Sequence, residues 1–108
     1  MASVILSAAR TPVGSFGGAL STVPAPSLGA TAITGALDRA GVATDQVDEV
    51  ILGNVVTAGE GQAPARQAAI KAGLGEHCEA TTVNKMCGSG MQAAIMAHDA
   101  IKAGSIDV

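Results

Sequence analysis

Aromatic residues are almost absent from this chain. Phe16 is the only one, and there is neither tryptophan nor tyrosine. The hydrophobic residues still make up 48% of the sequence, and nearly all of them are Ala, Val, Ile and Leu. Any core must therefore be built from small aliphatic side chains. Together with 14 glycines, this composition is typical of closely packed helices and strands and excludes a disordered or fibrous chain.

Positive charge is also scarce. The 108 residues include six Lys and Arg against nine Asp and Glu, which gives a formal net charge of −3. Binding to a phosphate backbone requires a cluster of cationic side chains, and these six are scattered along the chain. The sequence therefore predicts that nucleic acid is not a partner.

Long hydrophobic runs and a cysteine framework are missing as well. No apolar run approaches the roughly 20 residues that a membrane-spanning helix needs. Two cysteines in a chain of this length do not form a disulfide framework, which favours a reducing compartment. The first ten residues lack a charged segment followed by a long hydrophobic stretch, so no export or transit peptide is expected. We expect a cytoplasmic protein with no membrane partner.

Short apolar runs alternate with helical periodicity along the chain. Strands are predicted at residues 4–8, 50–52 with 55–56, and 80–83, and a further apolar stretch begins at 106–108. Residues 11–26 read as a loop. Helices are predicted from a Ser27 cap to Gly41, from Pro64 to Gly73, and along a stripe ending at Gly104 that contains Met91, Ala94, Ile95, His98 and Ile101.

The resulting order is β-α-β-α-β-α-β, which predicts an α/β fold with a mostly parallel sheet and helices packed on it. The strands at 50–52 and 55–56 are apolar on successive residues, as in sheets covered on both faces. The last stretch stops in its first residues, so residues 1–108 are expected to be a truncated part of a larger amino-terminal domain.

The segment around Cys87 offers the best candidate for chemistry. Cys87 lies where the strand at 80–83 passes into a helix, so backbone N–H groups and the positive helix end favour its thiolate. Gly88 and Gly90 leave the turn open, so that a substrate carbonyl can approach the sulfur. From these residues alone, Cys87 is either a nucleophile or an ordinary small buried side chain.

The run from Asn84 to Ala93, NKMCGSGMQA, resembles the acyl-enzyme signature of thiolases. Three other segments also resemble thiolases, in family order and at family spacing, so the resemblance covers the whole chain. They are SAARTPVG at 7–14, VILGNV at 50–55 and GEGQAPARQAA at 59–69.

The resemblance implies a thiolase-like layered fold and an acyl-CoA acyltransferase in which Cys87 accepts the acyl group. Acyl-CoA and CoA would be substrates, with no cofactor, and the intact enzyme would be a homo-oligomer. The family also uses a histidine that activates the nucleophile, a second cysteine, and an Asn/His pair in the oxyanion hole. None of these motifs occurs in this chain, so the chain alone is expected to be inactive.

The other candidate residues have simpler explanations. His77 falls in a predicted loop and His98 on the predicted inward stripe, which favours surface and packing roles. Cys78 follows a glutamate and a histidine in the same loop, which favours a structural role for its thiol. Together with Cys87 these residues lack a zinc spacing, so no metal site is expected.

Three alternatives remain open from the sequence. Arg66 either pairs across a dimer or is a solvated helix-start residue paired with Glu60. The enzyme is either a thiolase or another condensing enzyme of the same superfamily, although the Gly88-Ser89-Gly90 sequel favours thiolase. The chain is either part of a catalyst or a non-catalytic module that pairs with a complementary chain.

Overall fold

The computed structural model describes residues 2–108, which form a small α/β fold. The elements are α1 (Ala25–Ala40), a 3-10 turn η1 (Thr44–Gln46), β1 (Glu49–Gly53), α2 (Pro64–Lys71), β2 (Glu79–Val83) and α3 (Ser89–Ala103). The two strands pair in parallel, with Glu49 opposite Glu79 and Gly53 opposite Val83. The predicted α/β class and the parallel pairing are confirmed.

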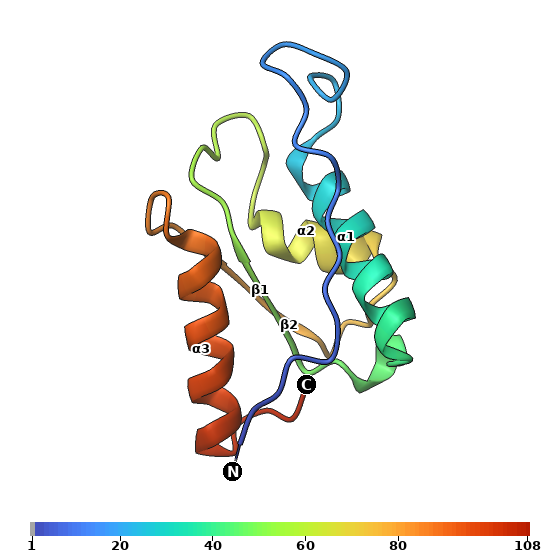
Figure 1. The fold of residues 1–108 in the computed structure, drawn as a ribbon, viewed down its shortest axis with the longest axis vertical. Coiled ribbons are helices and arrows are strands. Elements are labelled where there is room, and N and C mark those ends of the chain that lie inside the picture. Colours follow the sequence, from blue (N-terminus) through green and yellow to red (C-terminus); the bar gives the residue numbers. More distant parts are fainter. Residues whose placement is uncertain (1) are drawn as a thin grey trace.

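The helices cover both faces of this sheet. Figure 1 shows α3 on one side of the strands and α2 on the other, with α1 packed against α2. The buried core lies on the side of α1 and α2 and consists of small residues, as the composition predicts. Its members are Val47, Val50, Ala69, Leu74 and Cys78.

Local signals predict the helix ends well. Gly41 and Gly104 adopt left-handed conformations with φ of 67° and 77° directly after α1 and α3. Pro64 is the first residue of α2. The predicted Ser27 cap is wrong, because α1 begins at Ala25 with Pro26 in its first turn, and proline is preorganised for that position.

Residues 4–8, predicted as a buried strand, are extended but unpaired in the described structure. Val4, Ile5 and Leu6 are 73%, 91% and 62% exposed. The segment instead lies along α1, where the Ser7 hydroxyl donates to the Ala36 carbonyl (2.6 Å) and Arg39 donates to the Ala8 carbonyl. No strand within residues 2–108 pairs with this segment, so its apolar side chains stay exposed.

The predicted strand residues 55–56 and 106–108 also lie outside the sheet. The chain near Val108 nevertheless reaches the start of β1, where the Val108 carbonyl accepts a hydrogen bond from the Asp48 N–H (2.8 Å). The Asp48 carboxylate accepts from the N–H groups of Asp107 (2.7 Å) and Val108 (3.1 Å). These hydrogen bonds hold the pKa of Asp48 below its usual value.

The face of α3 predicted to point inward is largely wrong, because Met91, Ala94, Ile95 and His98 are exposed and only Ile101 is half-buried. Ser89 and Ala93 are the buried residues of this helix, whereas Met91 and Ile95 are 69% and 46% exposed. Only a narrow stripe of small residues on α3 packs against the sheet. The larger apolar side chains of this helix are not covered by any other element within residues 2–108. Part of the periodicity therefore marks an uncovered surface.

Candidate active site

Cys87 lies in the tight turn that joins the end of β2 to the start of α3. The strand ends at Val83, the helix begins at Ser89, and Cys87 is exposed between them. The turn is closed by hydrogen bonds from the Gly88 N–H to the Lys85 carbonyl (3.0 Å) and from the Ser89 N–H to the Met86 carbonyl (3.2 Å). The structure therefore places the candidate cysteine at an accessible strand-to-helix junction.

The residue before Cys87 has a strained backbone. Met86 adopts a left-handed conformation with φ of 50°, and within residues 2–108 the only other non-glycine residue with positive φ is Ala63. For a residue with a side chain this conformation costs about 1–2 kcal/mol. Such strain persists only where neighbouring groups impose it, and it is common at functional sites.

Two polar side chains support this turn. The Asn84 Oδ1 atom accepts a hydrogen bond from the Met86 N–H (3.1 Å). The Ser89 hydroxyl accepts from the Lys85 N–H (2.9 Å) and donates to the Met86 carbonyl (2.6 Å). Both peptide groups of Met86 are thus held by side chains on either side of Cys87.

The start of α3 leaves backbone donors beside the cysteine. The first hydrogen bond within the helix runs from the Gln92 N–H to the Gly88 carbonyl (2.9 Å), so the N–H groups of Gly90 and Met91 precede the helical ladder. Nothing lies within 4 Å of where a Gly90 Cβ would be. A positive helix end and free N–H groups can stabilise both a thiolate and a developing oxyanion.

The end of β1 packs closely against the start of α3. A Cβ atom added to Gly53 would lie 2.6 Å from the Ser89 Cβ, 2.8 Å from the Ser89 carbonyl carbon and 3.0 Å from the Gly90 nitrogen. Two of these neighbours are backbone atoms, which cannot rotate away. The resembling segment VILGNV thus contains a glycine that lets β1 approach the start of α3.

We expect Gly53→Ala to destabilise the chain by about 1–3 kcal/mol, because the added methyl group must push α3 away from β1. Urea unfolding followed by circular dichroism measures this change. Gly90→Ala is the matched control, since its added Cβ meets open space in a helix, where alanine is favoured over glycine. An unchanged urea midpoint for Gly53→Ala would contradict the close packing of Gly53 against the start of α3.

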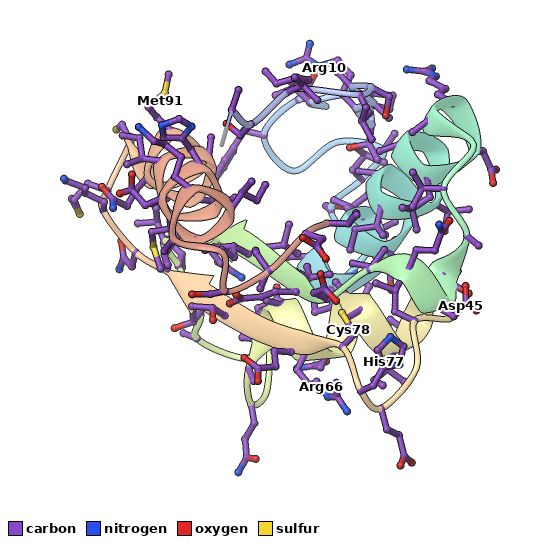
Figure 2. All side chains as sticks on the ribbon, turned by 90° about the horizontal axis from the view of Figure 1, so that it is seen from below. Arg10, Asp45, Arg66, His77, Cys78 and Met91 are labelled. Atoms are coloured by element: carbon purple, nitrogen blue, oxygen red, sulfur yellow. The ribbon has the colours of Figure 1, made fainter. Side chains whose placement is uncertain are left out.

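Cys78 occupies a different environment. It is fully buried and directly precedes β2, and its carbonyl accepts a hydrogen bond from Arg66 Nη1 (2.6 Å). Figure 2 shows Cys78 close to the sheet, with Arg66 and His77 towards the outside. Burial raises the pKa of the Cys78 thiol, an effect that the Arg66 charge opposes. The prediction of a structural thiol agrees with this setting.

Arg66 does not pair with Glu60 as one alternative predicted. Its guanidinium donates to the Cys78 carbonyl, while the Glu60 carboxylate accepts from the Ala25 N–H (3.3 Å). Arg66 therefore joins α2 to the start of β2, and pairing across a dimer stays a prediction.

The structure does not bring either histidine to Cys87. His77 is exposed in the loop before β2, as predicted. His98 is also exposed, and its Nδ1 atom lies 2.5 Å from the Ser3 hydroxyl, so the predicted packing role is wrong. With a rise of about 1.5 Å per residue, His98 lies about 14 Å along α3 from Ser89.

Among residues 2–108, no group of three or more His, Cys, Asp or Glu side chains is arranged to hold a metal ion. No helix in this described part is both long and apolar enough to cross a membrane. Sequence reasoning missed the roles of Gly53, Asn84 and Ser89, although the resembling segments contained all three.

Comparison with known proteins identifies the family. The family model described as thiolase, N-terminal domain, matches residues 3–108. An acetyl-CoA acetyltransferase from Cupriavidus necator is 60% identical over 105 residues, covering 97% of this chain and 27% of the relative. A mitochondrial acetyl-CoA acetyltransferase from Danio rerio is 54% identical over 105 residues, covering 97% of this chain and 25% of the relative.

A solved structure agrees with these sequence matches. A thiolase from Ascaris suum, crystallised in complex with coenzyme A, superposes with a TM-score of 0.92 at 39% identity, covering 94% of this chain and 27% of that one. The chain thus spans about a quarter of the length of the relatives it matches. With a family model matched over nearly its whole length, the chain belongs to the thiolase family and corresponds to part of the thiolase N-terminal domain.

Proposed function

We propose that this chain is the amino-terminal part of an acetyl-CoA acetyltransferase, an acyltransferase in which Cys87 carries the acetyl group. The observation that carries the proposal is the exposed position of Cys87 on a strained turn at the start of α3. The names of the relatives and the coenzyme A complex of the structural neighbour support acyl-CoA as the substrate class.

The proposed reaction has two steps. The Cys87 thiolate attacks the thioester carbonyl of acetyl-CoA, and the CoA thiolate leaves and takes up a proton. A second acetyl-CoA then loses an α-proton to a base, and its carbanion attacks the acetyl-cysteine carbonyl. This forms the new carbon–carbon bond of acetoacetyl-CoA and returns the Cys87 thiolate. The reverse sequence is thiolysis.

The chain supplies the nucleophile and its surroundings to this scheme. The N–H groups of Gly90 and Met91 are donors available to a thiolate or an oxyanion near Cys87. The base, the activating histidine and the remaining oxyanion groups belong, by family resemblance, to the rest of the enzyme. The coverage of about a quarter of each relative supports this division of the catalytic groups.

No cofactor takes part in the proposed reaction, since the CoA thioesters are substrates. We also propose a homo-oligomer for the intact enzyme, as the resemblance to thiolases implies. A cytoplasmic location stays a prediction, and the relatives include mitochondrial enzymes.

The direct test is to trap the acetyl-enzyme. The full-length enzyme is mixed with isotopically labelled acetyl-CoA without a second acceptor, quenched in acid and digested, and the label is mapped by mass spectrometry. We expect the label on Cys87 and the release of one equivalent of CoA per active site. Label on Cys78, or no covalent label together with normal turnover, would refute the proposal.

A further inference from the structure

Ser89 is an unusual residue in this structure. It is only 5% exposed, and it is the one polar residue that is buried within residues 2–108. Burying a hydroxyl is unfavourable unless its hydrogen-bonding capacity is satisfied. The Ser89 hydroxyl meets this condition by accepting from the Lys85 N–H (2.9 Å) and donating to the Met86 carbonyl (2.6 Å).

These two hydrogen bonds do not serve the helix to which Ser89 belongs. Ser89 is the first residue of α3, and no side chain caps this helix. The hydroxyl is instead directed toward the turn, where it forms hydrogen bonds with the Lys85 N–H and the Met86 carbonyl. Its bonding pattern is therefore directed at the strained turn, and helix capping does not account for it.

The residue held by this pattern is Met86. Its carbonyl accepts from the Ser89 hydroxyl, and its N–H donates to Asn84 Oδ1 (3.1 Å). Two side chains thus hold the peptide groups on both sides of the Met86 Cα atom, which has a φ of 50°. Removing the hydroxyl would leave the Met86 carbonyl with only the longer hydrogen bond from the Ser89 N–H (3.2 Å) and would leave the Lys85 N–H without its side-chain partner. The left-handed conformation of Met86 would then be held less firmly.

We infer that Ser89 is a positioning residue for Cys87: its buried hydroxyl holds the left-handed turn at Met86, and this turn aims the sulfur relative to the start of α3. The inference rests on the proposed function, because it assigns a role in the acyl transfer by Cys87. Ser89 does not touch the reacting atoms, and it acts through the backbone of Met86 and Cys87.

Close packing at Gly53 restricts the position of Ser89. The absence of a side chain at Gly53 lets β1 lie against the Cβ and backbone of Ser89. The serine is therefore held from one side by the sheet while its hydroxyl holds the turn on the other. Rate depends steeply on such placement, because a misplacement of about 1 Å can reduce turnover about 100-fold.

The test is Ser89→Ala in the full-length enzyme. We expect kcat to fall about 10- to 100-fold while the KM for acetyl-CoA stays within about threefold, since substrate binding is not touched. Alkylation of Cys87 by iodoacetamide, which needs no oxyanion geometry, should change by less than about threefold. Ser105→Ala, which changes an exposed serine just beyond α3, is the matched control and should leave both rates unchanged.

Conservative and compensating variants separate positioning from folding. Ser89→Thr keeps the hydroxyl but adds a methyl group beside Gly53, so it should recover more of kcat than Ser89→Ala without reaching the original value. Ser89→Cys keeps the volume but offers only a weak donor and acceptor, so it should show the alanine defect even if the alanine variant does not fold. Adding Met86→Gly to Ser89→Ala should restore part of the rate, because glycine adopts positive φ without support.

An unchanged kcat in both Ser89→Ala and Ser89→Cys would overturn the inference. Equal losses in acetylation and iodoacetamide alkylation would also overturn it, since they would indicate a general loss of structure. Failure of the proposed function has a different signature. In that case Cys87→Ala retains turnover, whatever the Ser89 variants do.

Discussion

Replacing Cys87 with alanine is expected to reduce thiolysis of acetoacetyl-CoA by the full-length enzyme by at least about 10⁴-fold. The reason is that the acetyl group has no other exposed thiol in this chain to which it can transfer, and removing a covalent nucleophile can cost up to about 10⁶ in kcat. Turnover is followed by the loss of acetoacetyl-CoA absorbance in the presence of CoA. Circular dichroism checks that the variant is folded.

Cys78→Ala is the matched control for this experiment. Cys78 is fully buried and packs in the core with Val47, Val50 and Leu74, so its replacement affects stability by about 1 kcal/mol and leaves turnover near normal. A Cys87→Ala enzyme with near-normal turnover would remove the basis for assigning Cys87. An inactive but folded Cys78→Ala enzyme would contradict the structural role of Cys78.

The isolated 108-residue chain is expected to show no thiolysis above background. General acid and base assistance is worth about 10² to 10⁴ in rate, and no histidine lies near Cys87 to provide it, since His98 is bonded to Ser3 and His77 is in the loop before β2. The measurement is the same absorbance assay with the purified chain. Turnover near that of an intact thiolase, with contamination excluded, would refute this expectation.

Adding the missing part of the enzyme provides the control for this result. A separately produced polypeptide corresponding to the rest of the full-length enzyme is mixed with the chain during refolding. Recovery of activity that depends on Cys87 would show that the chain is folded and lacks only its catalytic partners. No recovery, together with activity of the chain alone, would contradict the division of the site between the two parts.

Several parts of the fold follow from local sequence signals. Gly41 and Gly104 end helices because glycine adopts left-handed conformations at little cost, and Pro64 begins α2 because proline suits the first helical turn. The strand predicted at residues 80–83 matches β2 within one residue. These signals depend on a few neighbouring residues, so they are readable without knowledge of the fold.

Predictions that required a partner segment were less reliable. Residues 4–8 have the apolar pattern of a buried strand, yet Ile5 is 91% exposed, because no strand within residues 2–108 pairs with them. Met91 and Ile95 have helical spacing but are 69% and 46% exposed. Periodicity shows which residues share a face, and only the packing shows what covers that face.

For the site, the sequence by itself determined the family resemblance, the candidate nucleophile Cys87 and its place between a strand and a helix. Only the tertiary structure revealed that Met86 is left-handed, that Ser89 is buried and bonded to the turn, and that Gly53 makes room for it. The physical reason is distance along the chain. Gly53 and Ser89 meet only because β1 and α3 pack together, and no local pattern encodes that contact.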